Sequence, residues 1–163
     1  MIIGGYAALY HGHARFTEDI DIVLGVDIDE FDEIFKAVRS KFTPRAENPK
    51  SFAQKTNVFP ILGRQEDVRV DLIFSFLEFE RDAIKRALST SIKGRKVRII
   101  QAEDLIIYKM VAGRARDLED VKVLFEKNKN ELDLQNINST LQELSKLLGN
   151  DEIIKNWNSI TFN

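Results

Sequence analysis

Two aspartates separated by one residue, Asp19 and Asp21, have the clearest chemical potential in this sequence. They alternate with Ile20 and Ile22, so in a β-strand both carboxylates would lie on one face and the apolar side chains on the other. Neighbouring carboxylates repel each other unless water surrounds them, one is protonated, or a cation lies between them. Mg²⁺ or Mn²⁺ would suit this position, because hard divalent cations take oxygen ligands and support phosphoryl transfer.

Asp71 is the candidate for a third carboxylate. It lies between Val70 and Leu72 in a second segment with the alternation of a strand. A pair of aspartates on an exposed strand is often only solvated, and that interpretation stays open for Asp19 and Asp21. The apolar opposite face of their segment and the glycines before it favour a functional site.

Gly4 and Gly5 follow the apolar segment 1–3 and precede the small and apolar segment 6–10. This order predicts a strand, a tight turn and a short helix. Backbone N–H groups at the start of a helix can bind phosphate, and glycine allows close approach. The alternative is a tight turn without a ligand, because Gly-Gly matches neither the P-loop nor the dinucleotide-binding pattern.

The residues between these motifs have weaker signals. His11 and His13 lack the further ligands that a zinc site needs, so we expect structural residues or residues at the edge of a substrate site. Arg15 and Thr17 come just before the carboxylate strand. They are expected either to approach a nucleotide or to hold the loop in place.

Periodicity predicts the elements that would position these groups. An α/β region is expected over residues 1–100. Its predicted elements are a strand over 19–24, a helix over 28–42, a loop over 43–55, strands over 52–62 and 67–74 joined by a turn at 63–66, a helix over 78–88, and a hairpin over 90–100 centred on Gly94. Residues 101–163 show helical periodicity, with helices expected near 105–110, 118–125, 133–148 and 151–157. The predicted fold class is α/β (α+β), with a small mixed sheet flanked by helices and the helical region packed on it as one structural unit.

Composition limits the function classes. A chain of 163 residues has room for one ordinary domain, and its net charge of −2 argues against a polybasic nucleic-acid binder, although a local basic surface remains compatible with it. The absence of cysteine excludes disulfides and thiolate chemistry. No segment resembles a signal peptide or is long and apolar enough to cross a bilayer, so a cytoplasmic protein without a membrane partner is expected.

Several motifs in order resemble the polymerase-beta-like nucleotidyltransferase superfamily. This chain resembles the first motif of that superfamily at Gly4-Gly5-Tyr6-Ala7-Ala8, His11-Gly12, Arg15, Thr17 and Asp19-Ile20-Asp21. It resembles the strand that carries the third acidic residue of the superfamily at Val70-Asp71-Leu72-Ile73. The segments Glu103-Asp104-Leu105-Ile106, Lys109 and Arg116-Asp117-Leu118-Glu119-Asp120 are similar to the branch of abortive-infection (AbiEii-type) toxin nucleotidyltransferases. Together these segments span nearly the whole chain.

The resemblance implies transfer of a nucleoside monophosphate from a nucleoside triphosphate, with pyrophosphate as the leaving group. Gly4 and Gly5 would cradle the triphosphate, with Arg15 and Thr17 near the nucleotide. Metal ions would bind to Asp19, Asp21 and Asp71, and Asp71 would also help to deprotonate the acceptor hydroxyl. Lys109 would be a cation of the site, with Arg116, Asp117 and Asp120 beside it; alternatively, the two aspartates cap a helix or pair with Arg114 and Arg116.

The sequence departs from the superfamily pattern in two ways. Many members have a helix before the first strand, and many have Gly-Ser where this chain has Gly4-Gly5, which would remove one hydroxyl contact to phosphate. The resemblance implies an RNA end or a protein hydroxyl as acceptor, a toxin–antitoxin or phage-defence setting, and a cognate antitoxin as a possible partner. A nucleotide-binding or protein-interaction module with little catalysis, and a structural subunit with solvated carboxylates, are the alternatives.

Overall fold

The computed structural model describes residues 1–64 and 67–161, and the chain divides into two compact units. Unit 1 comprises Met1–Ala7 and Phe16–Ile100, and unit 2 comprises Ala8–Arg15 and Gln101–Asn163. The boundary therefore passes through the first helix, α1 (Gly4–Tyr10). Residues 8–15 belong to unit 2, although they lie within the predicted α/β region. The packing of the helical region on the α/β core stays a prediction.

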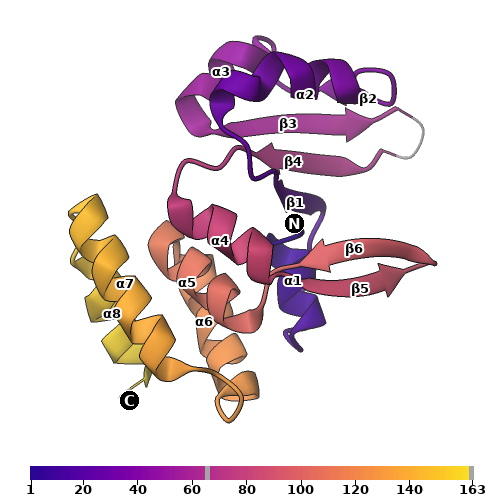
Figure 1. The fold of residues 1–163 in the computed structure, drawn as a ribbon. Helices are drawn as coiled ribbons and strands as arrows, with labels where there is room; N and C mark the ends of the chain where they lie inside the picture. Colours follow the sequence, from indigo (N-terminus) through magenta and orange to yellow (C-terminus); the bar gives the residue numbers. More distant parts are fainter. Residues whose placement is uncertain (65–66, 162–163) are drawn as a thin grey trace. The chain divides into compact units, whose positions relative to one another are not determined.

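A small mixed sheet forms the centre of unit 1 (Figure 1). Its strands are β1 (Asp19–Val23), β2 (Phe42–Pro44), β3 (Val58–Gly63) and β4 (Arg69–Ile73), in the order β1-β4-β3-β2. β1 and β4 are parallel, whereas β3 is antiparallel to both of its neighbours. The predicted mixed α/β fold is thus confirmed.

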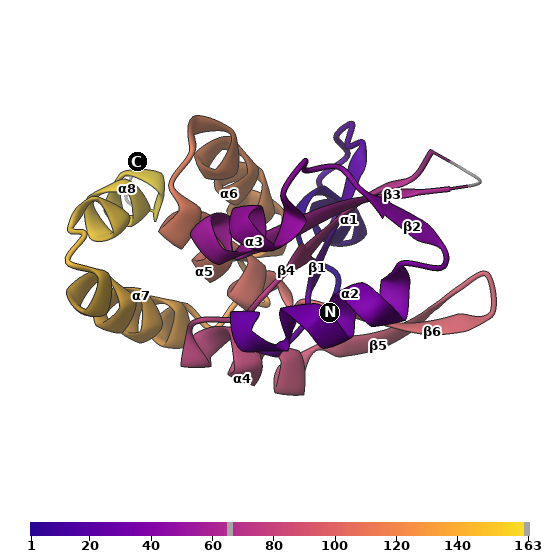
Figure 2. The ribbon, with the colours of Figure 1, turned by 90° about the horizontal axis from the view of Figure 1, so that it is seen from above.

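One face of this sheet carries the hydrophobic core of unit 1. The strands place Phe59, Ile61, Val70 and Leu72 on that face because alternate residues share a side. A short 3₁₀ helix, η1 (Ile28–Glu30), leads into α2 (Phe31–Val38), and α3 (Pro49–Thr56) follows β2. The helices α2 and α3 cover the core face in both views (Figures 1 and 2). The opposite face is therefore left for polar residues.

The structure corrects the prediction for residues 28–55. The predicted helix over 28–42 ends at Val38, and Phe42 instead begins β2. The predicted loop over 43–55 contains most of α3, with Pro49 in its first turn, where a proline needs no hydrogen-bond partner for its nitrogen. The strand predicted from residue 52 begins at Val58, after Asn57 ends α3 in a left-handed conformation.

The helix predicted over 78–88 is α4 (Glu78–Arg86), which ends before Leu88. The hairpin predicted over 90–100 is confirmed as β5 (Leu88–Ile92) and β6 (Arg95–Ile99), and it begins two residues earlier than predicted. Residues 1–3 form no named strand, but Ile2 bridges Ile22 in an antiparallel sense and Ile99 in a parallel sense. Gly4 and Gly5 begin α1 instead of forming a separate turn. In the turn predicted at 63–66, Gln65 and Glu66 lie outside the described residues.

Unit 2 contains the predicted helices, namely α5 (Ala102–Ala112), α6 (Ala115–Asn128), α7 (Leu134–Leu148) and α8 (Glu152–Thr161). Gly113 and Gly149 end α5 and α7 in the left-handed conformation that favours glycine. Trp157 is buried, its ring is nearly perpendicular to that of Phe125, and its Nε1 donates a hydrogen bond to Oδ1 of Asn138. Over the described ranges, no helix has the length and apolar character that a membrane span requires.

Candidate functional site

The three predicted carboxylates lie on the polar face of the sheet in unit 1. β1 and β4 pair with Asp21 opposite Asp71, and Asp19 lies two residues before Asp21 on the same side. Ile20 and Ile22 face the core instead. We call Asp19, Asp21 and Asp71 the acidic triad. The alternation in the sequence therefore predicted which side chains share this face.

Gly4, the first residue of α1, lies directly against the acidic triad. Its φ is +62°, and a Cβ built on it would lie 1.8 Å from Oδ2 of Asp21. No residue with a side chain fits there, so glycine is required both by conformation and by space. The carboxylate thus lies beside the first turn of α1, where backbone N–H groups lack intrahelical partners and favour negative charge.

Arg45 lies between two members of the acidic triad. Its Nη1 is 3.4 Å from Oδ1 of Asp19 and 3.5 Å from Oδ1 of Asp71. The backbone N–H of Arg45 donates to the carbonyl of Pro60, which pairs with Asp71, so Arg45 continues this row of residues across the sheet. A guanidinium thus occupies the position between carboxylates where the sequence predicted a metal ion.

Asp71 is electrostatically strained. Burial raises the pKa of its carboxyl, the negative charge of Asp19 raises it further, and Arg45 opposes both effects. Its Oδ1 is buried and forms no hydrogen bond within the described part of the chain, and Nη1 of Arg45 lies 3.5 Å from it. A buried carboxylate oxygen without a hydrogen-bond donor favours the approach of a cation.

The chemistry of the acidic triad fits a divalent metal, because its ligands are carboxylate oxygens and one of them lacks a hydrogen bond. The arrangement of these carboxylates is less complete than a metal site requires. Among residues 1–64 and 67–161, no three acidic or histidine side chains converge in an arrangement that could hold a metal ion. The carboxylates would have to move toward one another and Arg45 would have to move away before all three could act as ligands.

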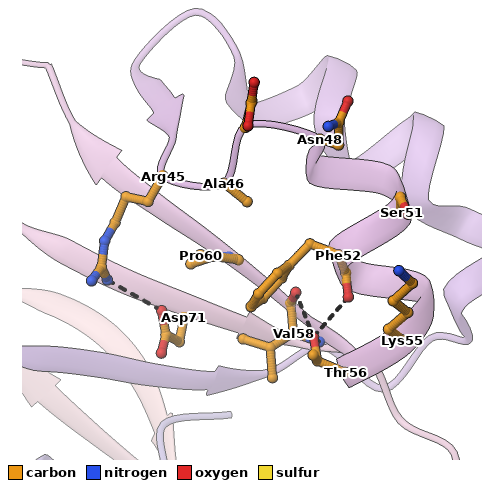
Figure 3. A pocket seen from close by; sticks show the side chains of 11 residues that line it. Arg45, Ala46, Asn48, Ser51, Phe52, Lys55, Thr56, Val58, Pro60 and Asp71 are labelled. Atoms are coloured by element: carbon orange, nitrogen blue, oxygen red, sulfur yellow. Dashed lines mark hydrogen bonds and ion pairs between the residues drawn. The ribbon is translucent and has the colours of Figure 1, made fainter.

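A pocket of about 710 Å³ opens beside Asp71 (Figure 3). Its floor includes Val58 and Pro60 of β3, and α3 contributes Phe52 and Lys55 to its wall. Phe52 remains 42% exposed, so an aromatic face is available in the pocket. The volume suits a ligand of nucleotide size, and the pocket begins where Arg45 meets Asp71.

Unit 2 contains a second group of predicted site residues, in a buried charge cluster that consists of His13, Arg15, Lys109, Asp117 and Asp120. Nζ of Lys109 donates to Oδ1 of Asp117 at 3.0 Å and to Oδ2 of Asp120 at 2.5 Å. Nε2 of His13 lies 3.0 Å from Oδ1 of Asp120, and Nε of Arg15 lies 3.4 Å from Oδ2. The side chains of Lys109 and the two aspartates are at most 6% exposed, which makes this cluster very different from a solvated surface.

Each titratable side chain of this cluster has a partner of opposite formal charge within 4 Å. Burial alone would raise the pKa of Asp117, but hydrogen bonds from Arg114 and Lys109 outweigh it, and the pKa is lowered. The pairing of Asp117 with Arg114 matches the structural alternative for this residue, although the aspartate is buried. Arg116 is exposed on α6. Removing any one partner would leave a buried charge uncompensated.

The remaining predicted site residues have local roles in this structure. Oγ1 of Thr17 donates to the backbone carbonyl of Asp19, which holds the start of β1 in place. Gly5 is buried in the first turn of α1. Arg15 belongs to the cluster of unit 2, where its Nε is buried and makes no hydrogen bond among the described residues.

Two features of these sites were not predictable from the sequence, namely Arg45 and the partner of His13. Arg45 fell within the predicted loop over 43–55, and no signal in the sequence showed that it directly follows a strand, β2. His13 is 107 residues from Asp120, so no local pattern could pair them. Both contacts depend on chain segments that meet only after folding.

Comparison with known proteins adds independent information. Residues 2–153 match the model of a family described as nucleotidyl transferase AbiEii toxin, type IV TA system. No curated protein matches the chain. The fold is similar to that of an antigenic nucleotidyltransferase-like protein from Paracoccidioides brasiliensis, with 16% identity, a TM-score of 0.53, and coverage of 99% of this chain and 88% of that one. A protein from H. pylori described as a nucleotidyltransferase has 22% identity and a TM-score of 0.45, over 96% of this chain and 71% of that one.

Proposed function

Because this chain belongs to the AbiEii nucleotidyltransferase toxin family, we propose that it transfers a nucleoside monophosphate from a nucleoside triphosphate to an acceptor hydroxyl. Pyrophosphate would be released. The observation that carries the proposal is the alignment of Asp21 with Asp71 on one face of the sheet, beside Asp19 and against the start of α1. Phosphoryl transfer depends mostly on positioning and charge neutralisation, and this arrangement is suited to both.

Mg²⁺ or Mn²⁺ would be held by Asp19, Asp21 and Asp71. When bound, a divalent ion neutralises phosphate charge and supports the leaving pyrophosphate. The orphaned Oδ1 of Asp71 supports this assignment. Asp71 would also accept the proton of the acceptor hydroxyl, and its raised pKa brings it closer to the operating range of a general base.

The triphosphate would lie at the start of α1, where Gly4 and Gly5 provide backbone N–H groups without a side chain in the way. Thr17 would act indirectly, by fixing the start of β1. Arg15 would bind the nucleotide, which requires its guanidinium to leave Asp120, whose Oδ2 lies 3.4 Å from its Nε in this structure. Lys109 would supply a cation to a phosphate oxygen, with Asp117 and Asp120 as its positioning partners and Arg116 as an additional cation.

The acceptor in this proposal is an RNA end or a protein hydroxyl, and the setting is a toxin–antitoxin system with an antitoxin as partner, in the cytoplasm. The description of the family supports the toxin–antitoxin setting. It names neither the nucleotide nor the acceptor. The choice between acceptors therefore rests on the surfaces of this chain.

Thermal unfolding with each of the four nucleoside triphosphates, with and without Mg²⁺, tests the proposal. A ligand at about a hundred times its Kd should raise the melting temperature of the wild type by about 5 to 10 °C, because only the native state binds it. The Asp19→Asn, Asp21→Asn double variant should lose the metal-dependent shift. Asp82→Asn, which changes an exposed aspartate of α4, should keep it.

Pyrophosphate release in the presence of candidate acceptors separates the enzyme from a nucleotide-binding module with little catalysis. The second function is favoured by one observation, the position of Arg45 between Asp19 and Asp71. An enzyme should release pyrophosphate in a metal-dependent reaction that Asp21→Asn abolishes. A thermal shift without any pyrophosphate release would support the binding module, and the absence of any shift would refute both.

A further inference from the structure

The β5–β6 hairpin of unit 1 concentrates positive charge in a chain that is slightly acidic. Residues 83–102 contain six of the 24 basic residues and none of the 26 acidic residues. Two of the six, Lys85 and Arg86, end α4, and Lys85 pairs with Asp82. The other four lie on the hairpin at positions 93, 95, 96 and 98. The local charge therefore differs sharply from the net charge of −2.

Strand register divides the hairpin into two faces. Ser89 pairs with Arg98 and Ser91 pairs with Lys96, so one face carries two hydroxyls, two cations and no carboxylate. We call these four residues the basic face. The tip is formed by Lys93 and Gly94, both with positive φ, as a two-residue hairpin turn requires. The opposite face is mainly apolar and carries Leu88, Thr90, Ile92, Arg95, Val97 and Ile99.

Ile2 connects this hairpin to the central sheet through its bridges to Ile99 and Ile22. Paired residues share a side of a sheet, so Ile99 shares a side with Ile22, which faces the core. Arg98 and Lys96 therefore lie on the other side, the side of the acidic triad. The hairpin is a separate two-stranded sheet, and the bridges of Ile2 place its basic face on the same side as the acidic triad.

The cations near the tip are available for a partner. Arg98 donates to the carbonyls of Ile84 and Lys85 and anchors the hairpin to α4. Lys93, Arg95 and Lys96 are exposed, and across the described ranges they form no ion pair. Both views show the hairpin extending outward from the sheet of unit 1 (Figures 1 and 2). Five residue pairs give it a length of roughly 16 Å.

We propose that the β5–β6 hairpin docks the phosphate backbone of a single-stranded RNA end and leads it toward Asp71. The inference rests on the proposed function, since it identifies the acceptor as RNA. A row of hydroxyl and cationic donors without a carboxylate complements a repeating anion. β6 lies two strand spacings, roughly 10 Å, from β1, and the cations near the tip of the hairpin lie still further from the acidic triad. This separation suits a chain of phosphates better than a single triphosphate bound at the acidic triad.

RNA is favoured over an acidic protein by the composition of the basic face. A folded protein partner presents backbone and side-chain donors as well as acceptors, and the basic face has no carboxylate to receive those donors. The phosphate groups of an RNA backbone present only acceptors, at a regular spacing. The pocket beside Asp71, with the exposed ring of Phe52, offers space and an aromatic surface for a terminal base.

The test measures binding of a short fluorescein-labelled single-stranded RNA to the full chain, without nucleotide or metal, across a range of salt concentrations. The variant Lys93→Gln, Lys96→Gln removes the cation of the tip and one cation of the basic face, and it leaves the anchor Arg98 intact. Its affinity for RNA should fall several-fold at low salt, and the slope of log K against log salt should fall by about 1.4, as expected for two lost phosphate contacts. The matched control Lys36→Gln, Arg39→Gln removes the same number of positive charges at exposed positions near the end of α2 and should bind RNA as the wild type does.

Three outcomes would overturn the inference. These are undiminished binding by the hairpin variant, an equal loss in the control variant, and binding of polyglutamate by the wild type as tight as that of RNA. Circular dichroism and the Mg²⁺–nucleotide thermal shift confirm that the variant is folded with its acidic triad intact. RNA binding could depend on the hairpin while neither the wild type nor the variants show a rise in melting temperature with nucleotide and Mg²⁺. In that case the docking surface stands and the proposed transfer reaction fails.

Discussion

Arg45 has consequences for metal binding, because its guanidinium is the cation that Asp19 and Asp71 share in this structure. Arg45→Gln should bind Mn²⁺ several-fold more tightly than the wild type, since the metal no longer competes with a fixed positive charge. Without metal, the variant should lose up to about 1 kcal/mol of unfolding free energy, the usual limit for a partly exposed ion pair. Titration calorimetry and denaturant unfolding measure the two effects.

The matched control for Arg45 is Arg39→Gln, which removes an exposed arginine at the end of α2. It should leave Mn²⁺ affinity unchanged. If Arg45→Gln binds Mn²⁺ no better than Arg39→Gln does, Arg45 is not a competitor of the metal and serves only to order the segment after β2.

Asp71 should make stability depend on pH in the direction opposite to most aspartates. Its pKa is raised in the folded state, by burial first and by Asp19 second, so the folded protein holds this proton to higher pH than the unfolded chain. The stability that this proton provides is present below the ordinary pKa of 3.8 and is lost as pH rises through the raised pKa. At neutral pH without metal, Asp71→Asn should therefore melt a few degrees higher than the wild type.

A comparison of melting temperatures at acidic and neutral pH checks this sign. The stabilisation by Asp71→Asn should shrink as the pH falls toward the ordinary aspartate range. Asp82 is the control, because its pKa is lowered by a hydrogen bond from Lys85, and Asp82→Asn should not stabilise the protein. A variant Asp71→Asn that is less stable than the wild type at neutral pH would contradict the account of electrostatic strain.

At the scale of elements, the acidic triad depends on the contact between α1 and β1. Gly4→Ala should destabilise the protein by about 2 to 4 kcal/mol, because the methyl group meets Asp21 and the left-handed backbone disfavours alanine. Gly94→Ala in the hairpin turn also has positive φ but meets no atom within 4 Å, so it should cost only about 1 kcal/mol. Denaturant unfolding measures both values.

A second substitution identifies the source of this cost. Adding Asp21→Ala to Gly4→Ala removes the carboxylate that the methyl group meets, so part of the lost stability should return. An equal loss of unfolding free energy in Gly4→Ala and Gly94→Ala would show that only backbone conformation determines the effect. The close approach of Gly4 to Asp21 would then contribute nothing to it.

At the scale of the whole molecule, the path of the chain matters because unit 2 is built from two separate segments. Residues 8–15 contribute His13 and Arg15, which contact the buried Asp120. A fragment that starts at residue 101 lacks both partners. The melting temperature of its helices should be well below that of unit 2 in the full chain. The fluorescence of Trp157, the single tryptophan, follows both transitions.

The double variant His13→Ala, Arg15→Ala in the full chain separates the lost contacts from the effect of cutting the chain. The double variant should lower the melting temperature that Trp157 fluorescence reports. The variant His11→Ala serves as a control at a neighbouring histidine. If the fragment melts at the same temperature as the full chain, the segment 8–15 contributes nothing to unit 2 and Asp120 is stable without it.

Local patterns were sufficient for much of this protein. Alternation placed Asp19, Asp21 and Asp71 on polar strand faces, and helical periodicity predicted the helices after residue 101, because both patterns repeat over a few residues of chain. The ordered motifs also identified the family. The same patterns predicted the helix that ends at Val38 but failed over 39–55, where a three-residue strand and a short helix with a proline in its first turn leave no sustained period.

Tertiary structure alone decided which distant groups meet. The pairing of Asp21 with Asp71, the position of Arg45 between carboxylates, and the burial of Lys109 with Asp117, Asp120 and His13 all join segments far apart in sequence. Such contacts arise from strand register and helix packing, which depend on the fold as a whole and leave no periodic trace in the chain. The sequence by itself therefore determined the chemical groups and the local elements, whereas folding determined their partners, their burial and their charge states.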